Sequence, residues 1–134
     1  MSVVVDASVL VAAVINTGAH SEWSEDILIS GSLHAPEIAR AEATNILRRL
    51  ERANQISTAE ANAAYDDLMQ LSLETFGFDA FATRIWELRH TVTSYDAWYV
   101  ALAEALQLPL ATLDEKLSKA TGPECAFLMP TLSD

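Results

Sequence analysis

Cysteine is almost missing from the sequence: Cys125 is the only one among 134 residues. A single thiol cannot form an intrachain disulfide, and it excludes a zinc site built from several cysteines. Cys125 lies in the apolar stretch Cys125–Leu128, which predicts a buried, unreactive thiol. The first residues, Met1–Asp6, show neither the basic stretch nor the long apolar segment of a secretory signal. These observations favour a cytoplasmic protein.

Long hydrophobic runs are missing as well. No apolar segment approaches the roughly 18 residues that would indicate a membrane span, so we expect no contact with a membrane. Even so, 51% of the residues are hydrophobic and only 20% are charged. This balance is typical of a globular fold and not of a disordered chain. With no repeat, linker or low-complexity tract, the length predicts a single domain over residues 1–134.

Basic residues are scarce: eight Lys and Arg face nineteen Asp and Glu, which gives a net charge of −11. A protein with so large a negative net charge repels nucleic acid at long range. Bound divalent cations would, however, invert the sign of an acidic cleft. Half of the basic residues also share one segment, as Arg40, Arg48, Arg49 and Arg52. These two facts weaken the objection to a nucleic-acid enzyme without removing it.

Short apolar segments alternate with longer helical ones along the chain. We expect strands at Val3–Val5, Leu33–Ala35, Leu110–Thr112 and Ala126–Met129. Capping residues, prolines and glycines predict helices at Ala7–Val14, Ser21–Ile29, Pro36–Arg52, Ser57–Glu74, Ala80–Arg89, Tyr95–Gln107 and Asp114–Ala120. This order predicts an α/β fold, a three-layer α/β/α sandwich around a mostly parallel sheet of four or five strands.

Two acids follow predicted strands. Asp6 comes directly after Val3–Val5, and Asp114 lies two residues beyond Thr112. Sites in open parallel sheets form at the carboxyl ends of the strands, so both acids are candidate site residues. Each can instead be the N-cap of the helix that follows it, because Asp is a favoured cap. Ser8 competes with Asp6 for the first of these caps.

Two further acids lie on helices that have apolar faces. Glu42 has Ile38 one turn before it and Ile46 one turn after it, so it lies inside the apolar arc. A lone buried glutamate is costly unless it is paired or binds a metal, and its candidate structural partner is Arg49. Asp96 lies in the first turn of its helix, at the rim of the apolar face. The helix dipole alone would favour an acid there.

The four acids offer only carboxylate oxygens, which are the ligands that hard cations prefer. The three histidines are scattered and show no metal-ligand spacing. We therefore predict that Asp6, Glu42, Asp96 and Asp114 gather around Mg²⁺ or Mn²⁺.

Four segments carry a resemblance to a known family. They are Val3–Ser8, Pro36–Asn45, Ser94–Ala103 and Ala111–Asp114. In this order they resemble the PIN-domain family, and within it the VapC-type toxins of bacterial and archaeal toxin–antitoxin modules. The resemblance extends over nearly the whole chain, and the segment around Asp96 is its most specific part.

The resemblance implies a parallel sheet flanked by helices and a metal-dependent endoribonuclease that uses one or two Mg²⁺ or Mn²⁺ ions. The family's four acidic positions, which are catalytic and bind metal, are occupied by Asp6, Glu42, Asp96 and Asp114. Its supporting polar positions are occupied by Ser8, Asn45 and Thr112. The resemblance also implies an RNA substrate, a cognate antitoxin protein and a homodimer.

Arg48, Arg49 and Arg52 are candidates for guiding the RNA backbone, although they also suit a solvated helix end that complements the dipole. Two other functions stay open: a catalytically silent protein-binding module, and a metal-dependent phosphatase or DNA nuclease of similar fold. A phosphorylation-controlled receiver domain is disfavoured. It would need a second acid beside Asp6 and an acid on a middle strand, and Leu33–Ala35 offers none.

Overall fold

The computed structural model describes residues 1–131 and contains a five-stranded sheet in which all paired strands are parallel. The strand order is β3-β2-β1-β4-β5. The strands are β1 (Ser2–Val5), β2 (Ser32–Pro36), β3 (Leu73–Phe76), β4 (Leu110–Ala111) and β5 (Phe127–Leu128). The β-branched run Val3–Val5 is fully buried, as the sequence predicts for the central strand. Residues 132–134, the end of the expected domain, lie outside the described residues.

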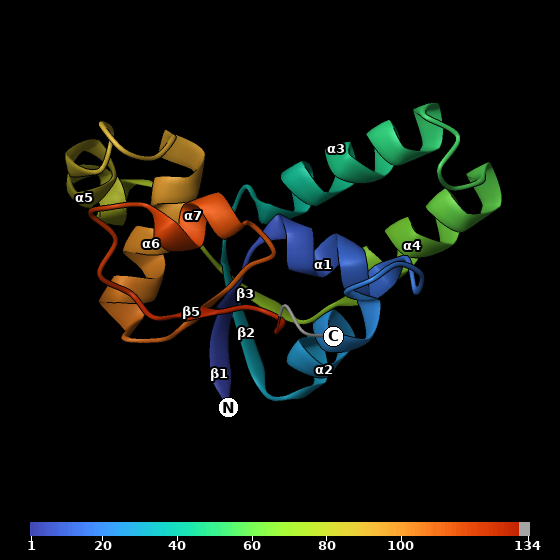
Figure 1. Ribbon diagram of the computed structural model, residues 1–134, viewed down its shortest axis with the longest axis horizontal. Helices are drawn as coiled ribbons and strands as arrows, with labels where there is room; N and C mark the ends of the chain where they lie inside the picture. Colours follow the sequence, from blue (N-terminus) through green and yellow to red (C-terminus); the bar gives the residue numbers. More distant parts are fainter. Residues whose placement is uncertain (132–134) are drawn as a thin grey trace.

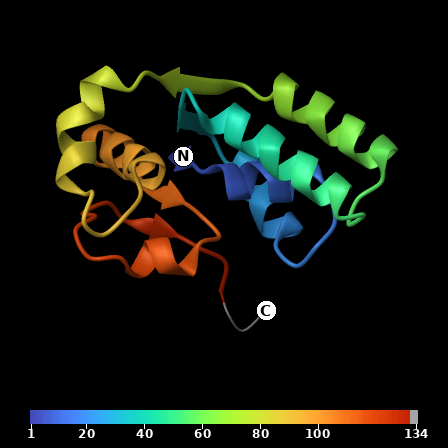
Figure 2. The same ribbon diagram turned by 90° about the horizontal axis from the view of Figure 1, so that it is seen from above.

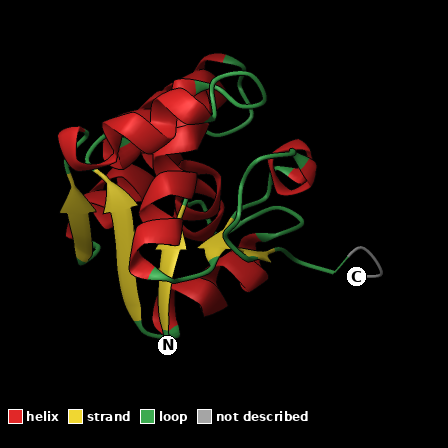
Figure 3. Cartoon of the chain, turned by 90° about the vertical axis from the view of Figure 1, so that its left-hand side faces the viewer, coloured by secondary structure: helices red, strands yellow, loops and turns green. Residues whose placement is uncertain are grey.

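Helices cover both faces of this sheet. They are α1 (Ala7–Val14), α2 (Ser21–Ile29), α3 (Ala39–Arg52), α4 (Thr58–Gln70), α5 (Ala82–Glu87), α6 (Ser94–Leu106) and α7 (Glu115–Lys119), with a 3₁₀ turn, η1 (Asp79–Phe81). Seen from above, α1 to α4 lie on one side of the sheet and α5 and α6 on the other (Figure 2). The predicted three-layer architecture is confirmed, and the strands lie between helices in Figure 3.

The longest helices are placed differently with respect to the sheet. α6 packs directly on β1, β2 and β4, and its central residues are buried. α3 and α4 pack against each other as a pair that reaches away from the sheet (Figure 1). The predicted capping box of α4 is present, because Ser57 N donates to Glu60 Oε1 at 2.8 Å and Glu60 N donates to Ser57 Oγ at 3.0 Å. Among residues 1–131, no helix combines the length and hydropathy needed to cross a membrane.

Pro36 corrects one expected boundary. It is the last residue of β2, paired with Phe76 of β3, and α3 begins only at Ala39. Proline lacks an N–H, so it suits the end of a strand, where the next residue continues the ladder. Glu37 N does so by donating to Phe76 O at 2.9 Å.

The region between α4 and α6 corrects two further expectations. The helix expected to reach Glu74 ends at Gln70, and Leu73–Phe76 is the edge strand β3. Glu74 and Thr75 of this strand are exposed, and an edge strand with polar residues shows no apolar run in the sequence. The helix expected over Ala80–Arg89 is the η1 turn followed by the shorter α5.

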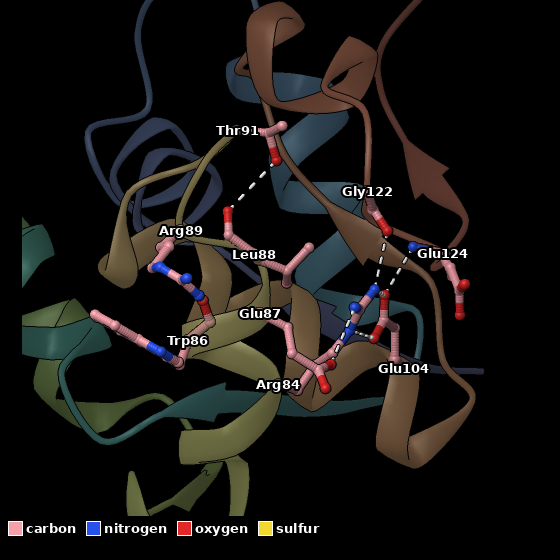
Figure 4. A network of polar contacts seen from close by, with 9 residues as sticks. All are labelled: Arg84, Trp86, Glu87, Leu88, Arg89, Thr91, Glu104, Gly122 and Glu124. Carbon is pink, nitrogen blue, oxygen red and sulfur yellow. Dashed lines mark hydrogen bonds and ion pairs between the residues drawn. The ribbon is translucent and has the colours of Figure 1, made fainter.

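A polar network fastens the C-terminal segment to α5 and α6 (Figure 4). Arg84 Nε donates to Glu104 Oε1 at 2.7 Å, and Arg84 Nη2 donates to Glu104 Oε2 at 3.0 Å and to Gly122 O at 2.9 Å. Glu124 N also donates to Glu104 Oε2 at 2.7 Å. Close by, burial raises the pKa of the half-buried Cys125 to about 11, so its thiol stays protonated at neutral pH.

Arg84→Ala is expected to lower the free energy of unfolding by about 1–3 kcal/mol, the usual cost of leaving a shielded charged acceptor underpaired. The side chain of Glu104 is only 16% exposed, and the substitution leaves it one hydrogen bond, from Glu124 N. Denaturant unfolding would measure the loss. Arg89→Ala is the matched control, because the exposed Arg89 lies over the Trp86 ring at 4.2 Å. Equal losses in the two variants would contradict the prediction.

Candidate active site

One cleft of about 390 Å³ contains all four predicted acids. Asp6 lies between β1 and α1, Glu42 and Asp96 lie in the first turns of α3 and α6, and Asp114 directly precedes α7. The remaining residues that line the cleft are Ala7, Ser8, Asn45, Ile46, Arg49 and Tyr99. The cleft therefore lies beyond the carboxyl ends of β1 and β4, where parallel sheets form their sites.

Asp6 is held from two sides. Ser8 Oγ and Val9 N, at 3.2 Å, donate to its Oδ1, and Thr112 Oγ1 donates to its Oδ2. Of the two candidate caps of α1, Asp6 fills the position and Ser8 does not. Burial raises the pKa of Asp6, and the hydrogen bonds from Ser8 and Thr112 partly offset that rise. The carboxylate is therefore fixed in one orientation.

The same two hydroxyls join the first and last acids. Ser8 Oγ accepts a hydrogen bond from Leu113 N at 3.2 Å, and Thr112 Oγ1 accepts one from Asp114 N at 3.0 Å. Asp114 in turn caps α7, because Leu117 N donates to its Oδ1 at 3.2 Å. The turn after β1 and the turn after β4 are thereby locked together, which places Asp6 and Asp114 on the same cleft.

Glu42 has a partner that sequence reasoning missed. Tyr99 Oη donates to Glu42 Oε1 at 2.7 Å, and Tyr99 is only 2% exposed. Within residues 1–131, no ion pair joins Glu42 to Arg49, the partner considered from the sequence. Burial raises the pKa of Glu42, the Tyr99 hydrogen bond opposes this, and the charge of Asp96 adds to it. The sequence signal that could have identified Tyr99 is its spacing from Asp96, because a residue one turn later lies on the same face of the helix.

Within residues 1–131, no ion pair neutralises the Asp96 carboxylate. Thr93 Oγ1 accepts a hydrogen bond from the Asp96 backbone N at 3.1 Å, so Thr93 is the N-cap of α6. Burial raises the pKa of the Asp96 carboxyl, and the nearby charge of Asp114 raises it further. The acids of the cleft therefore repel one another in the absence of a cation.

The polar and basic residues of α3 lie in three different places relative to the cleft. Asn45 and Arg49 line the cleft, and they lie on the same face of the helix as Glu42. Arg48 and Arg52 are exposed and do not line it. Arg40 is turned elsewhere, because its Nη2 donates to Leu71 O. Of the three arginines expected to guide RNA, the structure brings only Arg49 to the acids.

The residues of the cleft fit a hard divalent cation by their chemistry, because they supply four carboxylates and no soft ligand. As placed, no three Asp, Glu, His or Cys side chains of residues 1–131 converge on a common point. Asp6, Glu42 and Asp114 instead accept hydrogen bonds from the protein. Binding a metal therefore requires side-chain rotation, for which the exposed Asp114 has room.

The chain is similar to known proteins over most of its length. The PIN domain family model matches residues 3–123. Ribonuclease VapC1 of Mycobacterium tuberculosis is 39% identical over 123 residues, which cover 91% of this chain and 92% of that protein. Ribonuclease VapC9 of the same species is 34% identical over 123 residues, covering 92% and 94%.

A solved structure shares the fold at low sequence identity. The crystal structure of VapBC2 from Rickettsia felis, bound to a DNA fragment from their promoter, superposes with a TM-score of 0.67 at 16% identity. The match covers 98% of this chain and 100% of that chain. With the family match over residues 3–123 and relatives above 30% identity across most of their length, this chain belongs to the PIN-domain family.

Proposed function

We propose that this protein is a metal-dependent endoribonuclease, the toxin of a toxin–antitoxin module, folded as one PIN domain over residues 1–134. The observation that carries the proposal is the gathering of four acids, from four separate parts of the chain, in one cleft. The matched relatives, VapC1 and VapC9, are named ribonucleases. The proposed catalytic residues and metal ligands are Asp6, Glu42, Asp96 and Asp114.

The proposed cofactor is Mg²⁺ or Mn²⁺, one or two ions, held by these four carboxylates. When bound, such an ion supplies a Lewis acid that lowers the pKa of water and neutralises charge on the phosphodiester. The supporting residues act through the ligands: Ser8 and Thr112 fix Asp6, and Tyr99 fixes Glu42. A ligand that is already oriented by the protein loses little freedom on binding the ion.

Arg49 and Asn45 complete the proposed site on the α3 side of the cleft. Arg49 brings the only basic side chain that lines the cleft within the described residues, and it can pair with a phosphate oxygen. Asn45 offers an amide that can donate to RNA or accept from it. Arg48 and Arg52 are proposed to act further along the backbone, because both are exposed on the same helix.

The proposed partners are RNA, a cognate antitoxin protein and a second copy of the chain, and the proposed location is the cytoplasm. The likeness to VapBC2 supports an antitoxin. Tyr65 and Met69 of α4 are large apolar side chains that are 43% and 48% exposed, and such surface suits protein contacts.

Incubation of the purified protein with pooled tRNA, rRNA and mRNA tests the proposal. We expect discrete fragments with 5′-phosphate and 3′-hydroxyl ends in Mn²⁺ or Mg²⁺, and intact RNA in EDTA. Parallel reactions contain single-stranded DNA and a phosphomonoester. Cleavage of either of these with RNA left intact would support a DNA nuclease or phosphatase instead. No reaction on any substrate in either metal would support a catalytically silent binding module.

A further inference from the structure

A second, smaller hollow adjoins the acidic cleft. It measures about 270 Å³ and is lined by Ile38, Ala41, Glu42, Asn45 and Tyr95. Glu42 and Asn45 line both spaces, so the hollow and the cleft are neighbours on α3. The other three lining residues are the apolar Ile38 and Ala41 and the aromatic Tyr95. A molecule bound in the cleft can therefore contact the residues of the hollow as well.

Tyr95 is the unusual residue of this hollow, because its large ring is 58% exposed. It directly precedes Asp96 in the sequence and lines the hollow together with Glu42, one of the four acids. Within residues 1–131, the Tyr95 ring has no aromatic contact and its hydroxyl has no hydrogen-bond partner. Neither packing nor hydrogen bonding in the protein accounts for an aromatic side chain at this position.

The size and chemistry of the hollow match one flat ring system. Pockets for drug-sized ligands measure about 300–1,000 Å³, so a hollow of this size takes a smaller group. Unstacked RNA bases are bound on exposed aromatic side chains, and their edges form hydrogen bonds to polar groups such as an Asn amide. Stacking also suits a protein with a net charge of −11, because it does not depend on attraction to phosphate.

We propose that Tyr95, Ile38 and Ala41 form a nucleobase subsite, in which the base next to the cleaved phosphodiester stacks on the Tyr95 ring. The proposal rests on the ribonuclease function proposed above and adds a binding site to it. Asn45, which lines both spaces, contacts the edge of the stacked base. A protein partner fits less well, since specific interfaces bury about 1,200–2,000 Å² and the hollow offers a single large ring.

Steady-state cleavage of a short single-stranded RNA substrate tests the subsite with Tyr95→Ala, Tyr95→Phe and Trp86→Ala. Losing one stacked base raises KM by about five- to a hundredfold, and we expect this for Tyr95→Ala with little change in kcat. Tyr95→Phe keeps the ring and is expected to match the wild type. Trp86→Ala removes an equally exposed ring that does not line the cleft or the hollow, and it is expected to change nothing.

A second substrate, with an abasic ribose beside the cleaved bond, isolates stacking. The wild type should lose affinity for it, and Tyr95→Ala should then cause no further loss, because both changes remove the same contact. An unchanged KM for Tyr95→Ala, in a wild type that cleaves RNA, would overturn the subsite and leave the ribonuclease function standing. A wild type that cleaves no RNA would overturn both. A variant that loses dimerisation by light scattering would place Tyr95 in an interface instead.

Discussion

Asp96→Asn is expected to lower metal-dependent RNA cleavage by at least about a hundredfold. Loss of a residue that merely supports a metal ligand costs about 10- to 100-fold, so loss of a ligand itself costs more. Asn keeps the shape of Asp but has no charge and only one oxygen to offer a cation. The fold should survive, because the cap of α6 uses the backbone N of residue 96 and not its side chain.

Initial rates in Mn²⁺, with circular dichroism of each variant, would measure this effect. Asp66→Asn is the matched control, since Asp66 is an exposed acid on α4 that does not line the cleft. Asp6→Asn is a poorer test, because Asp6 is buried and caps α1, so its substitution also disturbs the fold. A rate for Asp96→Asn within tenfold of the wild type would contradict the assignment of the acids.

The parts of the fold that were predicted from sequence are those with an uninterrupted local signal. Val3–Val5 is β-branched and fully buried, so its strand and the acid that ends it were both identifiable. The position of Glu42 on an apolar arc likewise follows from helical spacing, and Glu42 is indeed partly buried. In both cases a few neighbouring residues contain the whole signal.

The parts that failed depend on partners far away in the sequence. Strand β3 forms by pairing with β2, as in Leu33 with Leu73, and its four residues show neither an apolar run nor a strict apolar–polar alternation. Tyr99 was not identified as a site residue from the sequence, because its partner Glu42 is 57 positions away. No local pattern carries contacts of this kind.

The sequence offers capping and a place in the site as alternatives for Asp6 and Asp114. In the structure both residues are N-caps, and both also line the cleft. Both oxygens of Asp6 accept hydrogen bonds from the protein, Oδ1 from Val9 N and the Ser8 hydroxyl and Oδ2 from the Thr112 hydroxyl, and Asp6 still lines the cleft. Asp114 uses Oδ1 for Leu117 N, so its second oxygen can face the cleft. A helix that begins at the end of a parallel strand has its N-cap residue at the edge of the sheet where sites form. One acid can therefore cap the helix and line the site.

Mn²⁺ or Mg²⁺ is expected to raise the melting temperature of the protein, by an amount that is larger at pH 7.5 than at pH 5.5. A ligand at about 100 times its Kd stabilises the native state by about 2.7 kcal/mol. Protons compete with the cation for the carboxylates, so the metal contributes less in acid. Thermal unfolding in EDTA and in millimolar Mn²⁺, at both pH values, would measure the difference.

The same experiment in EDTA tests the charge state of the cleft. The pKa values of Asp6, Glu42 and Asp96 are raised chiefly by burial, so each carboxyl binds protons more tightly in the folded protein. Such groups contribute stability below their unfolded pKa, about 4, and lose it as the pH rises through the folded pKa. The pKa of Glu104 is lowered overall in the folded protein. Glu104 therefore contributes stability above its unfolded pKa, and this contribution is lost only as the pH falls toward its folded pKa.

Metal-free protein should therefore melt at a higher temperature at pH 5.5 than at pH 7.5, and Asp96→Asn should reduce that difference. Asp96→Asn should also melt above the wild type in EDTA at pH 7.5, since it removes the repulsion between Asp96 and Asp114. The gain from Mn²⁺ should shrink in the same variant. A melting temperature that is the same in EDTA and in millimolar metal at pH 7.5 would mean that the four acids do not form a cation site. A site of this kind costs stability when empty, and the cation offsets the cost.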